Sequence, residues 1–270
     1  MKRNIDLSFI HNVLDYSEFE LPSKGFLYHN TDISEGICHV RPMSASEEKL
    51  IGKINNINNY SILNTIITNC VKEKNWDVDE LTLDDRFALL CFIRNITYGP
   101  KYNIITECPL CEAQELKIEI NLDDFDITFL EEEPKEPFDI ILPTTKIRLE
   151  LDMIRSKHIK QTNFQSYSEQ RKKGKTEDPR IYRKALCTAK MYLPNDEQDI
   201  LVRENEGDFP LILKVYNQLP SSDLLTIDKE WAKYDHGFME PTLTQCPVCE
   251  EYFSVLPQIR DEFFRPSISK

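Results

Sequence analysis

The chain has 270 residues, a hydrophobic content of 40%, a charged content of 29% and a formal net charge of −13. This length fits one large domain or two modest ones, and the apolar content suffices for a hydrophobic core. The acidic balance argues against a general nucleic-acid-binding protein, because phosphate contacts need a surplus of Lys and Arg on at least one face.

No stretch of the sequence predicts a membrane span. The longest apolar stretches, such as "FALLCFI" (87–93), fall well short of the roughly 20 residues that a spanning helix needs. Asp6, His11 and Asn12 interrupt any apolar run of a signal peptide near the N-terminus. We therefore expect an unexported chain in a reducing compartment, where its eight cysteines do not form disulfides.

The N-terminal part predicts a small β element followed by helices. In residues 18–42, Pro and Gly separate short alternating stretches, which is typical of strands and turns. Ser44 and Glu47 then fit a capping box, the usual signature of a helix start. Apolar residues recur at near-helical intervals from residue 51 to residue 70, so this region is predicted to be helical.

A further helix is predicted from Thr82 until Gly99 and Pro100 end it. Asp84 and Asp85 lie at its start, where a negative charge is favourable to the helix dipole. We interpret these two carboxylates as helix-start residues rather than as a catalytic acid-base pair.

The segments that follow predict a linker, paired strands and a helical region. "EEEPKEP" (131–137) is acidic and broken by two prolines, which is typical of a linker. Residues 138–152 look like paired strands, and residues 154–234 look mainly helical. "RKKGK" (171–175) is the best candidate for a nucleic-acid patch, but we interpret it as a solvated loop.

Two nearly identical cysteine motifs, which we call the CPxC hooks, occur as "ECPLCE" (107–112) and "QCPVCE" (245–250). A CxxC turn presents two thiolates to one ion, and zinc takes four such ligands in a tetrahedron. Alternating stretches follow both hooks, as strands do in a zinc ribbon. We predict one structural zinc per chain, held by Cys108, Cys111, Cys246 and Cys249. The alternatives are two reduced surface turns or a redox motif.

Four further cysteines occur singly and outside any CxxC pair. We interpret them as small residues of the hydrophobic core. They are Cys38, Cys70, Cys91 and Cys187.

The surroundings of the hooks repeat. Cys108 follows Gly99 by nine residues, and Cys246 follows Gly237 by nine residues. Three looser pairs accompany this match: "LTLDD" (81–85) with "LTIDK" (225–229), "LPSKGFLY" (21–28) with "LPTTKIRL" (142–149), and "SILNTIITNCV" (61–71) with "IYRKALCTAKM" (181–191). The pattern favours a diverged duplication over coincidence among short motifs.

We therefore predict an α+β fold with two related lobes joined by a composite four-cysteine zinc ribbon. The N-terminal lobe comprises residues 1–130 with the first hook, and the C-terminal lobe comprises residues 138–270 with the second. Residues 131–137 link the two lobes.

The sequence offers no catalytic motif. There is no phosphate-binding glycine loop, no GxSxG and no HExxH, and the chain has seven glycines. Asp235 and His236 are interpreted as turn residues before the second hook. A zinc ion with four cysteine ligands has no open position for water, so it supports folding rather than hydrolysis. We predict that the chain is not an enzyme.

Four motifs in order resemble the baseplate hub assembly protein family of T-even-type contractile-tail bacteriophages: "LPSKGFLY", "VRPMSASEEKL" (40–50), "ECPLC" and "FFRPS" (263–267). The resemblance implies a virus-coded, non-enzymatic protein made in the bacterial host cytoplasm. Such a protein would build, or become part of, the central hub of the tail baseplate and would contact other hub or tail proteins. Whether it stays in the virion is left open, and no catalytic residues carry over.

Two other classes remain as alternatives. A zinc-ribbon nucleic-acid-binding or transcription accessory protein would need a basic or aromatic face. An enzyme that uses a CxxC thiol would need a cysteine of lowered pKa in an electropositive setting, whereas Glu107, Glu112, Glu250 and Glu251 surround the hooks.

The C-terminal segment suggests a contact with a partner. Phe263 and Phe264 are adjacent, so their rings point in different directions on a strand or on a helix. We expect one ring to pack inside, while the other joins Arg265 in anchoring another hub protein. The alternative is that both rings complete the core.

Overall fold

The structure is a computed structural model of the chain, and it describes residues 15–54, 59–172, 178–194, 199–238, 242–255, 259 and 263–264. The chain divides into two compact units. Unit 1 comprises Met1–Trp76, Asp84–Phe129 and His236–Lys270, and unit 2 comprises Asp77–Leu83 and Leu130–Asp235.

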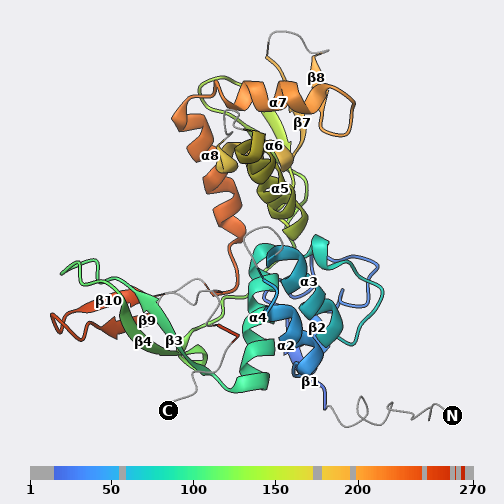
Figure 1. The fold of residues 1–270 in the computed structure, drawn as a ribbon. Helices are drawn as coiled ribbons and strands as arrows, with labels where there is room; N and C mark the ends of the chain where they lie inside the picture. The colour runs from blue at the N-terminus through green and yellow to red at the C-terminus, as the bar shows by residue number, and fades with distance from the viewer. Residues whose placement is uncertain are drawn as a thin grey trace. The chain divides into compact units, whose positions relative to one another are not determined.

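Unit 1 contains helices and three separate antiparallel hairpins (Figure 1). Its helices are α2 (Ala45–Ile51), α3 (Asn59–Cys70), α4 (Leu83–Tyr98) and the 3₁₀ turn η2 (Leu122–Asp124). Its strands are β1 (Ser17–Glu20) with β2 (Ile37–Val40), β3 (Lys101–Thr106) with β4 (Leu116–Asn121), and β9 (Thr242–Gln245) with β10 (Tyr252–Val255).

Unit 2 contains one antiparallel sheet in the order β5-β6-β7-β8, together with helices. The strands are β5 (Phe138–Ile141), β6 (Arg148–Leu151), β7 (Thr188–Tyr192) and β8 (Ile200–Val202). The helices are α5 (Ser156–Lys172), α6 (Pro179–Leu186), α7 (Asp208–Tyr216) and α8 (Ser221–Trp231), with 3₁₀ turns η1 (Val78–Glu80) and η3 (Ala232–Tyr234).

Local sequence signals explain several element boundaries. The capping box predicted at Ser44 and Glu47 is confirmed at the start of α2, where each side chain bonds the backbone of the other residue. Helix α4 ends at Tyr98, and Gly99 then adopts a left-handed φ of 85°, which glycine reaches without strain. The helix predicted between Thr82 and Gly99 is therefore confirmed.

The predicted mixture of helices and strands is confirmed, but one segment differs. Residues 181–191 were taken as a helical counterpart of residues 61–71. Helix α6 ends at Leu186 and β7 begins at Thr188, where it pairs with β6. The helical interpretation of the second half is wrong, because cross-strand pairing overrides a weak local helix preference.

The units do not coincide with the predicted lobes 1–130 and 138–270. The boundary between Phe129 and Leu130 lies beside the predicted linker, but the chain returns to unit 1 at His236. Both CPxC hooks therefore belong to unit 1. The linker itself is anchored, because the Glu136 carboxylate accepts hydrogen bonds from both terminal guanidinium nitrogens of Arg155 and from the Met153 N–H.

The four single cysteines are all buried, with exposed fractions of at most 2%, so their interpretation as core residues is confirmed. Burial raises the pKa of Cys70 to about 12. Within the described residues, no helix is both long and apolar enough to cross a membrane. Of "RKKGK" (171–175), Arg171 and Lys172 end α5, and residues 173–175 lie outside the described residues.

Candidate metal centre

Each CPxC hook forms the turn of its own hairpin. The first hook turn (residues 107–115) joins β3 to β4, and the second hook turn (residues 245–251) joins β9 to β10. The two hairpins lie side by side in unit 1, although their hooks are more than 130 residues apart in the chain (Figure 1). The fold thus brings the two hooks together.

The backbone folds in the same way around both hooks. The Leu110 N–H donates to Cys108 Sγ and the Val248 N–H donates to Cys246 Sγ, each over 3.4 Å. Four residues after each first cysteine the N–H donates back to its carbonyl, and that residue (Glu112 or Glu250) has a left-handed φ of 59° or 63°. The short sequence CPxCE therefore specifies one turn twice.

The four hook cysteines form one cluster. All four Sγ atoms lie within 4.8 Å of one another. Cys108 Sγ lies 3.9 Å from Cys249 Sγ, and Cys111 Sγ lies 3.8 Å from Cys246 Sγ. These separations are too long for a disulfide, in which the sulfurs are about 2.05 Å apart. They match the roughly 3.8 Å between sulfurs that sit about 2.3 Å from a central ion in a tetrahedron. The geometry is compatible with a metal site.

The surroundings of the cluster favour a thiolate. Cys108 and Cys246 are buried, whereas Cys111 is exposed and Cys249 is partly exposed. The pKa of Cys246 is lowered to about 7, chiefly because backbone N–H groups of Cys249 and Val248 donate to its sulfur. A thiolate is the form that binds a metal, so one ligand is ionised in part at neutral pH.

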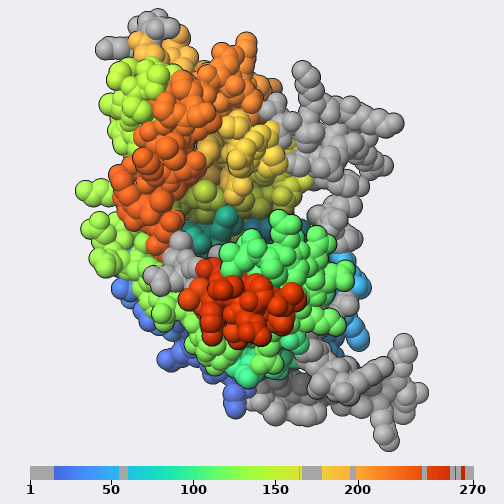
Figure 2. All heavy atoms as spheres, turned by 90° about the vertical axis from the view of Figure 1, so that its left-hand side faces the viewer, coloured from blue at the N-terminus to red at the C-terminus, as the bar shows by residue number. Residues whose placement is uncertain are grey.

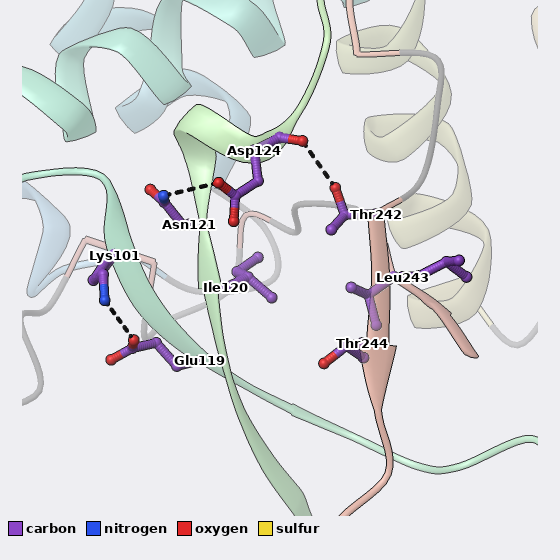
Figure 3. A pocket seen from close by; sticks show the side chains of 9 residues that line it. Lys101, Glu119, Ile120, Asn121, Asp124, Thr242, Leu243 and Thr244 are labelled. Carbon is purple, nitrogen blue, oxygen red and sulfur yellow. Dashed lines mark hydrogen bonds and ion pairs between the residues drawn. The ribbon is translucent and has the colours of Figure 1, made fainter. Parts of the chain in front are cut away.

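A cavity of about 210 Å³ lies between the two hairpins, beside β4 and β9 (Figure 3). Its polar lining groups bond one another: Lys101 pairs with Glu119 over 3.1 Å, and the Thr242 hydroxyl donates to the Asp124 carbonyl over 3.2 Å. The lining contains no cysteine or histidine, and its charged groups form no nucleophile-base pair.

One buried thiol–imidazole contact resembles a catalytic pair but lacks its chemistry. Cys187 Sγ lies 3.2 Å from His158 Nδ1 in unit 2. Burial raises the pKa of the Cys187 thiol to about 12 and lowers the pKa of His158 to about 3, the latter with help from Lys157. Both groups are therefore neutral near pH 7, and no activated thiolate forms.

Two buried carboxylates have a structural role that the sequence interpretation missed in part. Asp85 in α4 accepts from the Ser23 N–H over 2.9 Å and from the Tyr28 hydroxyl. Asp223 in α8 accepts from the N–H groups of Thr144 and Thr145. Each carboxylate thus holds the Leu-Pro turn that follows the first strand of a hairpin in its own unit.

These carboxylates lie at the same spacing as the hooks. Asp223 follows Asp85 by 138 residues, as Gly237 follows Gly99 and Cys246 follows Cys108. The resemblance of "LTIDK" (225–229) to "LTLDD" (81–85) has a spacing of 144 and is out of register, since "LTIDK" lies inside α8 rather than at its start. The common spacing would have revealed Asp223.

The expected anchor residues of the C-terminal segment are buried. Phe263 is 1% exposed and Phe264 is 3% exposed. The Phe263 ring packs edge-on against Tyr102, and the buried Arg94 donates to the Phe263 carbonyl. Neither ring lies at the surface, which matches the alternative that both complete the core. Arg265 lies outside the described residues.

Comparisons with known proteins give one match. Neither a search of curated proteins nor a search of solved structures found a similar protein. A family model described as "T4 bacteriophage base plate protein" matches residues 18–265, a range that includes both hooks and both carboxylates that hold the turns. This match extends over most of the sequence, and the chain therefore belongs to the T4 bacteriophage base plate protein family.

Proposed function

We propose that this protein builds, or forms part of, the central hub of the phage tail baseplate, and that its role is structural rather than enzymatic. The family match supports a baseplate protein and contacts with other tail or baseplate proteins. The order of the four motifs that resemble hub assembly proteins supports the hub in particular. The family match favours this function over a transcription accessory protein.

The observation that carries the structural role is the cysteine cluster. Four sulfurs at tetrahedral spacing form a closed ligand set, which leaves no position for a substrate or a reactive water. We assign one zinc ion per chain to Cys108, Cys111, Cys246 and Cys249. The ion would clip together two hairpins that are distant in sequence, and its binding energy would stabilise the fold.

A diverged duplication supports this arrangement. The spacing of 138 residues relates the hooks, the left-handed glycines Gly99 and Gly237, and the buried carboxylates Asp85 and Asp223. In this proposal each half donates two ligands, so the ion joins the two copies.

Metal analysis tests the zinc assignment. The protein purified without chelator is expected to contain one zinc per chain. Closing a loop between residues 108 and 246 constrains the unfolded chain by about 5 kcal/mol if the disulfide loop formula is used by analogy. Cys246→Ser and Cys108→Ser are therefore expected to lose the ion and to destabilise the fold by similar amounts. Metal-free protein of unchanged stability would contradict the assignment.

Affinity capture from infected cells tests the hub assignment. The tagged chain is expected to copurify with hub proteins of the same phage, and mass spectrometry of purified virions would show whether it remains in the particle. Copurification with RNA polymerase and no tail protein would instead favour the transcription accessory function.

A further inference from the structure

Exposed apolar side chains gather on the two hook hairpins. The described residues include eleven large hydrophobic side chains that are exposed, and five of them lie on these hairpins: Ile105, Leu110, Leu243, Val248 and Tyr252. Leu110 is 60% exposed and Val248 is 63% exposed. Figure 2 shows the β9–β10 hairpin in red at the surface, with green atoms of the β3–β4 hairpin around it. A concentration of this kind marks an interaction surface.

The exposed residues occupy equivalent positions on the two hairpins. Leu110 and Val248 each immediately precede the second cysteine of a hook, and Ile105 and Leu243 lie 138 residues apart. The N–H groups of Leu110 and Val248 are bonded to cysteine sulfurs, so the backbone beneath both side chains is fixed. A partner that binds here loses little entropy in ordering this surface.

The same turns are strongly acidic. The two hook turns contain five exposed glutamates and no Lys or Arg: Glu107, Glu112, Glu115, Glu250 and Glu251. Four thiolates around a divalent ion would add further negative charge. Complementarity therefore requires a basic partner surface. A second copy of this chain would bring like charges face to face, which costs several kcal/mol.

We infer that the two hook turns form a docking surface for another baseplate protein, one with an apolar recess bordered by Lys or Arg. Leu110 and Val248 enter the recess, and the glutamates pair with the basic border. The inference rests on the proposed baseplate function and adds the surface and the chemistry of the partner.

Binding to each purified baseplate protein of the same phage, measured by biolayer interferometry, tests the surface. Leu110→Ser combined with Val248→Ser is expected to weaken binding about tenfold or more, because exposed anchors dominate such interfaces. Ile141→Ser combined with Leu225→Ser is the matched control, since these side chains are 64% and 53% exposed in unit 2. The control is expected to bind within about twofold of the unmodified chain.

Charge reversal tests the chemistry of the partner without touching the apolar residues. Glu107→Lys combined with Glu251→Lys is expected to slow association about tenfold at low salt, with a smaller effect at high salt. Glu132→Lys combined with Glu206→Lys, both exposed in unit 2, is the matched control with the same change in net charge. Equal slowing by both pairs would show that only the overall charge matters, which would overturn the inference.

The outcomes separate this inference from the proposed function. If the unmodified chain binds a baseplate protein and the hook variants bind it equally well, the docking surface is wrong and the function stands. If the unmodified chain binds no baseplate protein, both fail. Metal content and melting temperature are measured on every variant; if Leu110→Ser and Val248→Ser lose metal, the charge pair alone decides. Dimerisation abolished by Leu110→Ser would show a second copy as the occupant and would also overturn the inference.

Discussion

Single buried carboxylates hold the turn of a hairpin in each unit. Asp223 is fully buried, and its two oxygens accept hydrogen bonds from the Thr144 N–H, the Thr145 N–H and the Thr145 hydroxyl. In Asp223→Asn one oxygen becomes an amide nitrogen that faces these donors. We expect a loss of about 1–3 kcal/mol in the free energy of unfolding. Urea denaturation measures it, and Asp199→Asn, at an exposed position, is the control.

The loss caused by Asp223→Asn depends on pH. Although burial raises the pKa of Asp223, the hydrogen bonds from Thr145 and Thr144 lower it below its usual value of 3.8. The stabilisation by the carboxylate is therefore fully present above pH 3.8, and it is lost as the pH falls through the lower pKa of the folded state. The two proteins should converge in stability at acid pH. A difference that grows below pH 3.8 would contradict this account.

The eight cysteines should react in two groups of four. Cys38, Cys70, Cys91 and Cys187 are buried and carry raised pKa values, because burial disfavours the thiolate. The hook cysteines are protected only by their ion. A thiol reagent is expected to label none or few sites in the zinc-loaded protein, four after chelation and eight after unfolding. Labelling of Cys91 before that of Cys108 in the chelated protein would contradict this order.

At the scale of elements, two equivalent turns predict unequal costs. Gly99 and Gly237 have nearly the same left-handed φ, 85° and 86°. Alanine at either position adds the strain of a left-handed residue, about 1 kcal/mol. A Cβ at residue 237 would also lie 3.1 Å from the Asp84 Cβ, whereas a Cβ at residue 99 meets nothing within 4 Å. Gly237→Ala should therefore destabilise the protein more than Gly99→Ala, as thermal unfolding can measure. Equal costs would show that the crowding relaxes.

Elements with a strong local signal could be predicted, and those that depend on distant pairing could not. The capping box at Ser44 predicted α2, and the cysteine spacing predicted which residues gather, because both signals act within a few residues. The strand after Leu186 was missed since Ala, Lys and Met favour a helix, while its pairing with β6 depends on residues far away in sequence. The unit boundary at His236 was missed for the same reason.

At the scale of the whole molecule, the chain of unit 2 lies between the two hook hairpins. Leu130–Asp235 leaves unit 1 after β4 and returns before β9, so the proposed ion closes unit 1 across a long insertion. Unit 2 has its own core, which includes Leu142, Leu149 and Met191 with no exposed surface. Its stability therefore does not depend directly on the hook cysteines.

Hydrogen exchange with and without a chelator tests this division of stability. Each hook hairpin is a two-stranded sheet, which is marginally stable alone, so removal of the ion should expose the backbone amides of residues 101–121 and 242–255 to exchange. The four-stranded sheet of unit 2 has no ligand to lose, and the amides of β5 and β6 should keep their protection. The Cys108→Ser variant without chelator should reproduce the pattern, which separates loss of the ion from other effects of the chelator. If β5 and β6 lose protection together with the hook hairpins, the two units unfold as one, and a clip that stabilises unit 1 alone is the wrong description.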